Sequence, residues 1–399
     1  MSTQPNSTPT LDLDPRDVER TLEPLERATM LPPAAFATAA VFDWELENIF
    51  RGWVCVGHVS VVDEPGKFVV RELGTDSILV VAGQDGVPRA FLNVCRHRGA
   101  RIVEDAEGQV RKRLRCPYHS WSYGLDGSLR AAPHMGEVED FDFACWGLIG
   151  VRLEVVGGLI LIDLSGEAPE IDDYLGELHS HLDRYRVSTL ERAGEVTYDV
   201  RANWKGIAEN YNECLHCPGV HPELNALSDY MSGNEVIGEG AWCGGSMTLR
   251  EGAKTMAIEN GRGGHTNGRP PIEGLGAEEI DSVVYLALFP NALISFHPDY
   301  VMLHTLWPRA AGRTEVICEW YFEPATVARD DFDPSDAVGF WDMVNKQDWY
   351  VCELAQKGVR TRNYTAGRYS SEEIDVHAFD LMVADRYMEA LRAGSAVPS

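Results

Sequence analysis

The 399-residue sequence lacks any apolar run close to the roughly 20 residues that a membrane-spanning helix requires, so no transmembrane segment is predicted. Its N-terminus, MSTQPNSTPTLDLDPRD, lacks the basic and apolar regions of a secretory signal, and we therefore expect a cytoplasmic protein. Basic residues are also scarce, since 35 Lys and Arg face 62 Asp and Glu for a formal net charge of -27. This charge argues against nucleic acid or an anionic membrane as a partner and suits a cationic small molecule better.

The sequence also lacks a Gly-x-Gly-x-x-Gly strand-turn-helix signature and a flavin module, so no dinucleotide-binding domain is predicted within it. Its nine cysteines are odd in number and stand in a long chain without a secretory signal. Metal ligation or burial is therefore favoured over disulfides. The length allows two domains with separate hydrophobic cores.

The pattern along the chain predicts an α+β protein. Short β-branched runs separated by turn signals such as Asp126-Gly127 predict a small antiparallel β domain, and a second region combines longer strand-like runs with helices. The helix expected at residues 335–357 begins after Asp333-Pro334, and the glycine-rich segment 251–276 is interpreted as a long mobile loop. The predicted divisions are a flexible tail (1–30), a helical lead-in that packs on the second domain (31–50), the β domain (51–163) and the second domain (164–399).

Four metal-ligand residues fall in two short loops of the β domain. Cys95 and His97 are separated by one residue, and Cys116 and His119 follow after a gap of eighteen residues with two residues between them. Each loop thus offers one thiolate and one imidazole. A mixed 2Fe-2S cluster needs two thiolates on one iron and two imidazoles on the other, which raises its potential above that of all-cysteine clusters. The pattern predicts an electron-relay centre.

Two other interpretations compete with this cluster. A structural zinc site also takes two Cys and two His, but zinc loops usually pair ligands of one type, whereas each loop here mixes them. The four residues could also be unrelated members of a core. The neighbours Pro117, Tyr118, Ser120 and Trp121 extend the second loop into the Cys-Pro-Tyr-His-x-Trp motif of Rieske loops, which favours the cluster.

A second group of candidate ligands lies in the segment NWKGIAENYNECLHCPGVHPEL. Glu213 and His216 are three apart and would share one face of a helix. His216 and His221 would point about 140° apart on an unbroken helix. They converge only if the helix breaks at Pro218-Gly219, and a proline disfavours helical geometry in the residue before it. The alternative is that these histidines are satisfied core residues.

Two histidines need one carboxylate to complete the facial triad of a non-haem iron site. In the last long helix Trp341, Val344, Asp348 and Cys352 fall on one stripe, so Asp348 is a lone acid on an apolar face. A buried carboxylate without a partner is costly, and metal ligation would satisfy it. We therefore predict that Asp348 is the third ligand.

With both ligand groups in this order, the chain resembles the alpha subunits of Rieske non-haem iron oxygenases, which include ring-hydroxylating and N-demethylating enzymes, from about Leu31 to Leu391. The resemblance implies an N-terminal all-β Rieske 2Fe-2S domain and a C-terminal helix-grip catalytic domain with an antiparallel sheet and a mononuclear Fe(2+). It implies a homotrimer, or a multiple of three, in which Glu213 bridges His216 and the partner subunit's His119.

Glutamate at this bridging position, where most aromatic-ring members of the family carry aspartate, resembles the branch that oxidises glycine betaine, carnitine and other quaternary amines. Quaternary ammonium groups are held by aromatic faces, each worth roughly 0.5–2 kcal/mol. Aromatic residues in sheets are more often core than cage, and both interpretations stay open here. The candidate wall residues of the substrate pocket are Tyr230, Trp242, Tyr285, Phe289, His297, Tyr300 and Trp307, and His304 is a further candidate.

The predicted function is that of a terminal oxygenase, which uses O2 and electrons from a separate NAD(P)H-dependent reductase or ferredoxin to demethylate a quaternary amine such as glycine betaine. Ring hydroxylation of an aromatic compound is the first alternative, and a non-enzymatic Rieske electron carrier is the second. A run of basic residues stands out on the acidic chain, either as a docking face for an acidic reductase or as a solvated loop. It consists of Arg96, Arg98, Arg101, Arg111, Lys112, Arg113 and Arg115.

Overall fold

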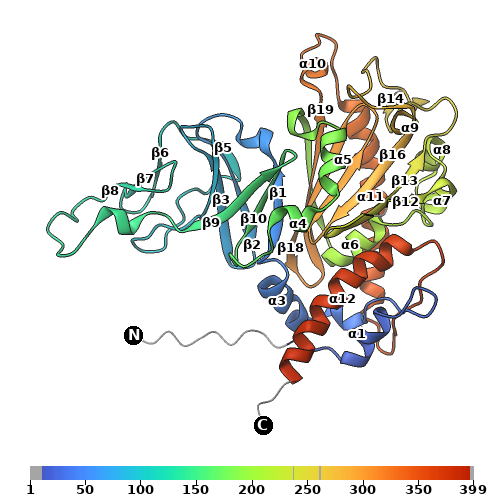
Figure 1. The fold of residues 1–399 in the computed structure, drawn as a ribbon, viewed down its shortest axis with the longest axis horizontal. Helices are drawn as coiled ribbons and strands as arrows, with labels where there is room; N and C mark the ends of the chain where they lie inside the picture. Colours follow the sequence, from blue (N-terminus) through green and yellow to red (C-terminus); the bar gives the residue numbers. More distant parts are fainter. Residues whose placement is uncertain (1–10, 237, 260–261, 396–399) are drawn as a thin grey trace. The chain divides into compact units, whose positions relative to one another are not determined.

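The computed structural model describes residues 11–236, 238–259 and 262–395 (Figure 1). Its internal contacts divide the chain into two compact units. The β unit is Arg51–Ala168, and the mixed unit contains the chain before Arg51 together with the chain from Pro169 onward. The β unit is therefore inserted into the sequence of the mixed unit. Strands dominate the first unit and helices accompany a sheet in the second, which confirms the predicted α+β class.

The β unit is built on a sheet of order β1-β10-β9-β4-β3-β2-β5, and a smaller sheet of order β6-β7-β8 lies at one end of the unit (Figure 1). Neighbouring strands pair antiparallel, and β2 turns into β3 at Gly74, whose φ of +58° suits a glycine. Aliphatic and aromatic side chains from both sheets form its core. The strands are β1 (Trp53–His58), β2 (Lys67–Leu73), β3 (Asp76–Ala82), β4 (Pro88–Leu92), β5 (Glu107–Gln109), β6 (Arg113–Arg115), β7 (Ser122–Gly124), β8 (Leu129–Ala131), β9 (Gly150–Val156) and β10 (Leu159–Asp163).

The mixed unit contains an antiparallel sheet of order β11-β19-β18-β17-β16-β13-β12. Strand β17 is buried along its whole length, and β18 along most of it, because side chains cover both faces of the sheet centre. The longer strand-like runs predicted for this region correspond to β11 and to β16 through β19. The bounds are β11 (Glu191–Val200), β12 (Asn234–Glu235), β13 (Trp242–Thr248), β14 (Ile258–Glu259), β15 (Arg262–Gly263), β16 (Ser282–Leu288), β17 (Ala292–Phe296), β18 (Val301–Ala310) and β19 (Arg313–Phe322).

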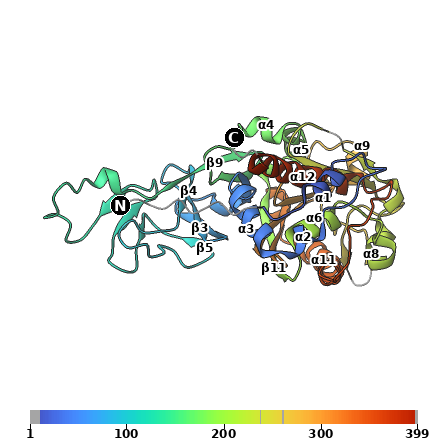
Figure 2. The ribbon, with the colours of Figure 1, turned by 90° about the horizontal axis from the view of Figure 1, so that it is seen from below.

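Three helices of the mixed unit pack together beside the sheet, and Figure 2 shows α6 between α11 and α12. Helix α11 begins after Asp333, whose side chain accepts a hydrogen bond from the Ser335 N–H, and it buries Phe340, Trp341 and Val344 along one stripe. The helices are α1 (Pro15–Thr21), α2 (Pro33–Ala37), α3 (Ala39–Asn48), α4 (Ile171–Leu175), α5 (Leu178–Arg184), α6 (Trp204–Tyr211), α7 (Cys217–Val220), α8 (Pro222–Leu227), α9 (Ala277–Ile280), α10 (Pro324–Val327), α11 (Ser335–Gly358) and α12 (Ile374–Ser395).

A buried charge pair joins the N-terminal helices to the rest of the mixed unit. Lys205 Nζ on α6 contacts Glu45 Oε1 on α3 at 2.5 Å, and both side chains are fully buried. Glu45 also accepts hydrogen bonds from Trp204 Nε1 on α6 and from the Tyr387 hydroxyl on α12. Removing one member of such a pair leaves an uncompensated buried charge, at a cost of about 3–5 kcal/mol. The lead-in helix α3 is thus an integral part of the mixed unit.

The prediction that residues 1–30 form a flexible tail is wrong for the described part of that range, and residues 1–10 lie outside it. Helix α1 lies beside α12 (Figure 1), and its Val18 is fully buried. Thr29 forms a β-bridge with Arg368. The sequence shows few apolar residues here, but burying Val18 and Ala28 is sufficient because α12 supplies the opposing surface.

The segment 251–276 also differs from the prediction of a mobile loop. In its described part Arg269 is buried and pairs with Asp299 at 2.8 Å and with Asp336 at 2.7 Å, so this charge network fixes the segment to the sheet and to α11. The sequence favoured metal ligation or burial over disulfides for the cysteines, but Cys214 and Cys217 are bonded to each other. Their positions in one tight turn bring the Cα atoms to 5.0 Å, within the range a disulfide requires.

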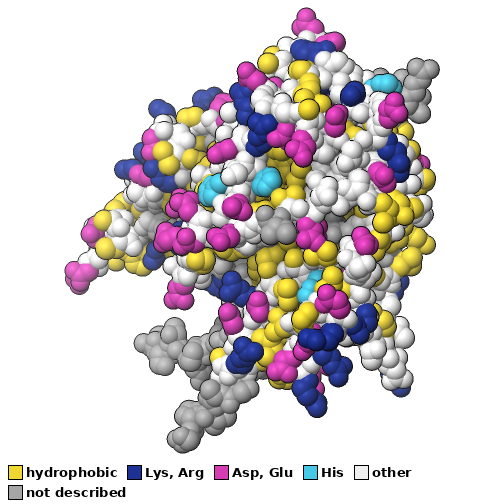
Figure 3. Space-filling view, turned by 45° about the vertical axis from the view of Figure 1, so that its right-hand side comes forward, with side chains coloured by type: hydrophobic (Ala, Val, Ile, Leu, Met, Phe, Trp, Pro, Cys, Tyr) yellow, Lys and Arg dark blue, Asp and Glu magenta, His cyan; other side chains and the backbone are white. Residues whose placement is uncertain are grey.

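Acidic and basic side chains are interspersed with apolar ones on the molecular face shown in Figure 3. Among the described residues, no helix is both long enough and apolar enough to cross a membrane.

Candidate metal centres and the adjoining cavity

Two adjacent loops of the β unit bring the predicted cluster ligands together. Cys95 and His97 follow β4, and Cys116 and His119 lie in the turn between β6 and β7. Each loop is closed by backbone hydrogen bonds, from the Cys95 N–H to the Ala100 carbonyl and from the Cys116 N–H to the Trp121 carbonyl, both at 2.8 Å. The two imidazole rings stand edge to face at 4.6 Å, and both thiols are buried.

The surrounding side chains hold these loops in place. Tyr123 accepts a hydrogen bond from the Arg96 N–H at 3.1 Å, which leaves its own hydroxyl proton free to donate to Cys95 Sγ at 3.3 Å. The His97 ring stacks on Trp121, with centroids 4.9 Å apart. Asn93 is buried and accepts hydrogen bonds from the N–H groups that follow the first loop. The loops are therefore preorganised around one point.

The donors present fit a mixed iron-sulfur cluster. His97 Nδ1 and His119 Nδ1 are buried and have no hydrogen-bond partner, although unsatisfied buried polar atoms are uncommon. Burial lowers the pKa of His119 and so favours the neutral imidazole that binds metal. Two buried thiols beside two unpartnered imidazole nitrogens are the ligand set of a Rieske cluster.

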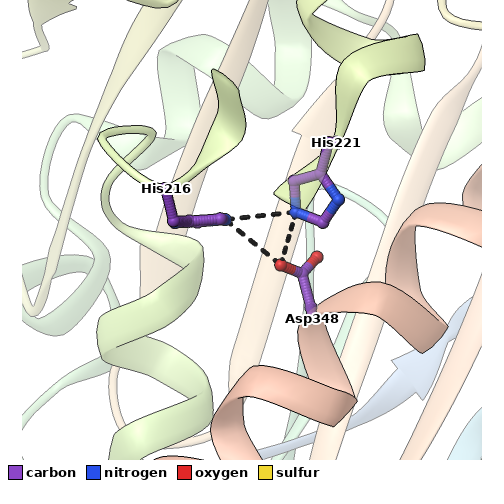
Figure 4. Close-up of side chains that lie close together, drawn as sticks. All are labelled: His216, His221 and Asp348. Atoms are coloured by element: carbon purple, nitrogen blue, oxygen red, sulfur yellow. Dashed lines mark hydrogen bonds and ion pairs between the residues drawn. The ribbon is translucent and has the colours of Figure 1, made fainter. Parts of the chain in front are cut away.

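In the mixed unit, His216, His221 and Asp348 converge on a second point (Figure 4). The two Nε2 atoms are 3.2 Å apart, and Asp348 Oδ1 lies 3.2 Å from His216 Nε2 and 2.7 Å from His221 Nε2. One donor atom from each residue lies within 4.8 Å of the others. Two imidazoles and one carboxylate are the donor set of a non-haem iron site with open coordination positions.

Each histidine is oriented through its other ring nitrogen. His216 Nδ1 contacts Glu213 Oε1 at 2.5 Å, and His221 Nδ1 contacts the amide oxygen of Gln347 at 2.7 Å. Both acceptors favour a proton on Nδ1, which leaves Nε2 with a free lone pair toward the centre. Gln347 was not predicted, although its place beside Asp348 and three residues after Val344 on the buried stripe is a signal for it.

The charges around the triad of His216, His221 and Asp348 also favour a bound cation. Burial works against charge on His216, but its hydrogen bonds to Asp348 and Glu213 outweigh burial and raise the pKa of His216 to about 9. Burial alone would raise the pKa of Asp348, yet the hydrogen bonds from His216 and His221 lower it. The carboxylates therefore stabilise positive charge at this point, which a divalent metal supplies.

No unbroken helix carries both histidines, but the predicted break at Pro218-Gly219 is wrong: these residues form helix α7, and the backbone leaves helical geometry at His221 instead. The first part of the segment also differs. Helix α6 ends at Tyr211, so Glu213 and His216 do not share a helix. Instead Glu213 Oε2 accepts hydrogen bonds from the N–H groups of Leu215 and His216, at 2.5 and 3.3 Å, which folds a turn around His216. His221 separates α7 from α8 with φ and ψ that are not helical. A competing side chain-to-backbone bond thus replaces the expected helix.

A cavity of about 470 Å³ opens beside the triad. Its walls carry aromatic side chains, from Tyr211 on α6, Tyr285 on β16 and Trp341 and Trp349 on α11. His304 on β18 also lines it, and burial lowers the pKa of this imidazole to about 4. The cavity is the size of a small-molecule site, and the triad forms part of its lining.

Two of the predicted wall residues, Tyr230 and Tyr285, line this cavity. The other five do not, and the structure corrects that prediction. They lie on sheet positions or adjoining turns whose side chains fill the core, where Trp242, Tyr300 and Trp307 satisfy their polar atoms internally. Residues with this outcome are Trp242, Phe289, His297, Tyr300 and Trp307. Strand sequence alone does not indicate which face meets a cavity.

Several lining residues were missed by sequence reasoning. Tyr211, Trp349 and the acids Glu235, Glu372 and Asp375 line the cavity. Tyr211 stands two residues before Glu213, so its proximity to the ligands was a usable signal. The acids come from β12, from the turn before α12 and from the start of α12, segments that only the tertiary fold brings together.

Comparisons with known proteins agree with this geometry. Residues 52–142 match the Rieske [2Fe-2S] domain, and residues 187–389 match the ring hydroxylating alpha subunit (catalytic domain). The glycine betaine monooxygenase oxygenase subunit of Pseudomonas aeruginosa is 30% identical, over 88% of this chain and 89% of its own length. The carnitine monooxygenase oxygenase subunit of Escherichia coli K12 is 36% identical, over 85% and 86%.

Among solved structures, a quaternary ammonium Rieske monooxygenase described for carnitine oxidation and inter-subunit electron transfer has a TM-score of 0.76 at 22% identity and covers 96% of this chain and 99% of its own. This likeness shows the same fold. Both family matches fall on the units that hold the two ligand sets. The chain therefore belongs to the Rieske non-haem iron oxygenases, as a ring hydroxylating-type alpha subunit with a 2Fe-2S cluster domain and a mononuclear iron domain.

Proposed function

We propose that this chain is the oxygenase component that hydroxylates an N-methyl group of a quaternary amine, which then loses formaldehyde. The observation that carries the proposal is the cavity beside the His216, His221 and Asp348 triad, whose walls are aromatic and acidic. Aromatic faces bind quaternary ammonium groups, which cannot donate hydrogen bonds. The glycine betaine and carnitine monooxygenase subunits at 30% and 36% identity support the same substrate class.

In this proposal His216, His221 and Asp348 hold iron, and iron in such a triad supplies dioxygen activation at its open positions. The chain's own residues do the rest. Glu213 and Gln347 keep both imidazoles in the tautomer that ligates through Nε2. The aromatic walls position the ammonium group so that one methyl faces the triad. The reaction consumes O2, two electrons and two protons, and it inserts one oxygen atom into a C–H bond while the other leaves as water.

Cys95, His97, Cys116 and His119 would hold the cluster that relays those electrons. We propose a homotrimeric arrangement in which Glu213 connects His216 to the partner subunit's His119. Glu213 is suited to this role because its carboxylate is already bonded to His216 Nδ1 and its side chain retains about 16% exposure. On the β unit, Tyr118 beside His119 is 60% exposed, so this edge of the cluster loops lies at the surface.

Electrons would come from NADH through a separate reductase or ferredoxin that docks on the basic run of the β unit. Arg98, Arg111, Lys112 and Arg113 are exposed. Arg101 is exposed too, but it pairs with Glu72 at 2.7 Å. A group of exposed basic side chains near the loops that hold the 2Fe-2S cluster suits an acidic partner and accelerates its association.

Oxygen uptake by the reconstituted enzyme with its reductase tests the function. We expect uptake that depends on a trimethylammonium compound, with formaldehyde and the demethylated amine as products. We also expect three irons per chain, two in the cluster and one in the triad. Uptake with aromatic acids and none with any quaternary amine would show that the enzyme is a ring hydroxylase instead. Two irons per chain, with no oxygen uptake, would show an electron carrier.

A further inference from the structure

The cavity beside the triad carries negative charge without any fixed positive counterpart. Glu235, Glu372 and Asp375 line it, and none of its lining residues in the described chain is Lys or Arg. Glu235 and Glu372 are exposed and Asp375 is half-buried, so these acids stand at the solvent side of the cavity. No basic side chain of the described residues forms a salt bridge with any of the three.

Two of the acids are held next to one strand. Glu235 on β12 pairs with Gly245 on β13, and a Cβ atom at Gly245 would stand 3.0 Å from Asp375 Oδ2. The N–H of Gly244 also donates to Asp375. The start of α12 therefore holds Asp375 against β13, and β12, which carries Glu235, is the neighbouring strand. This geometry is set by the sheet and the helix rather than by a flexible surface loop.

The inner part of the cavity presents a second, independent feature. His304 is 2% exposed, and its Nε2 lies 3.3 Å from the Asn345 side-chain oxygen, which accepts only. The proton is thus on Nε2, and Nδ1 carries a lone pair that has no partner among the described residues. A buried acceptor in a ligand cavity calls for a donor on the ligand.

We propose that the substrate is a quaternary ammonium compound that bears a hydroxyl group and no carboxylate, an amino alcohol of the choline type. This inference rests on the proposed function and narrows its substrate class. A betaine would place its carboxylate among three acids and a lone pair, with no Lys or Arg among the described lining residues to receive it, which is unfavourable. The hydroxyl of an amino alcohol supplies the missing proton, and its net positive charge is attracted by the acids.

The test compares two substrates that share a trimethylammonium group, choline and glycine betaine. Oxygen uptake and loss of each substrate, followed by proton NMR, are measured with the complete enzyme and its reductase at equal concentrations. We expect kcat/KM for choline to exceed that for glycine betaine by about tenfold or more. Glycine betaine turned over as well as choline would overturn the inference and leave the proposed function standing. Failure of choline while another trimethylammonium compound is oxidised would also overturn the inference alone. Failure of every trimethylammonium compound tested would overturn the proposed function and the inference with it.

Charge variants separate recognition from folding. Asp375→Asn and Glu235→Gln should lower kcat/KM for choline and raise it for glycine betaine, so that their ratio falls about tenfold in the double variant. The matched control is Asp385→Asn, an exposed acid on the same helix α12 that does not line the cavity. An equal loss for both substrates in the acid variants would show that these residues only support the structure and would reject the inference.

Discussion

The two metal centres of this chain are assembled in opposite ways. The cluster site takes its ligands from two loops between residues 95 and 119, and the two sheets of one small unit carry one loop each. The triad takes two histidines from a broken helical segment and its acid from α11, 127 residues later. The first site depends on local turns, whereas the second exists only when distant elements of the mixed unit pack. Each site should therefore be removable without the other.

The largest effect is expected when one ligand is deleted from each site in turn, which tests whether the two sites are independent. Asp348→Ala should abolish turnover and reduce the iron content from three to two per chain, because the triad loses its only carboxylate ligand. The visible cluster spectrum should stay. Cys116→Ala should do the reverse and remove the cluster signal while triad iron remains after reconstitution. Iron analysis with optical and EPR spectroscopy measures both, and full turnover in Asp348→Ala would identify a different ligand.

A smaller effect is expected from the residue that orients His221. Gln347→Leu removes the acceptor of the Nδ1 proton without removing a ligand, so the tautomer and ring orientation are no longer fixed. We expect a loss of about 10- to 100-fold in iron affinity or activity. The readout is iron retention against a chelator. Gln347→Glu, which keeps an acceptor at this place, should restore most of the affinity; no rescue would argue for a packing role instead.

The basic run of the β unit gives a third prediction. Replacing Arg111 and Arg113 by Glu should slow reduction of the cluster by the partner reductase about tenfold at low salt, since it reverses the charge of the docking face. Reduction by dithionite should be unchanged. Arg362→Glu, an exposed change in the mixed unit, serves as the control. Equal partner-driven rates in all three proteins would rule out docking on this face.

The smallest effect concerns pH. Burial, reinforced by the neighbouring charge of Glu235, raises the pKa of Asp375 from 3.8 to about 6, so its negative charge is lost below that pH and present above it. Other titratable groups near it are Glu372 and the Cys243 thiol on β13, whose pKa burial raises, so that it stays protonated. Affinity for a cationic substrate should therefore improve a few-fold as pH rises from 5 to 7. A KM profile that keeps this step in Asp375→Asn would assign it to another group.

The same contrast explains how far the sequence could be interpreted. The cluster loops were predicted with both ligand pairs because ligand spacing within a loop is visible along the chain. Asp348 was also placed beside the histidines by helical phase, since an acid on an apolar stripe is exceptional. Fold class, most strands and the long helix α11 follow from period and turn residues, and they agree with the structure.

What the sequence did not show depends on tertiary contacts. Glu213 was expected on a helix, but its carboxylate bonds the next N–H groups and stops that helix from forming. Helix α1 has too few apolar residues for its sequence pattern to predict a helix, and it forms because α12 covers Val18. Phe289 and Trp307 have the same strand-like context as Tyr285, yet only Tyr285 faces the cavity. The sequence of a strand does not indicate which face of the sheet lines the cavity.

The insertion of the β unit has a consequence for biogenesis. Its first and last strands pair directly, with Trp53 opposite Asp163, so the chain enters and leaves this unit at one place. The mixed unit, by contrast, has its lead-in helix on one side of the insertion and the partners of Glu45 on the other. During synthesis the first fifty residues must therefore wait, incomplete, until the far side of the insertion emerges from the ribosome. The electron-relay module meanwhile has every strand it needs to close early.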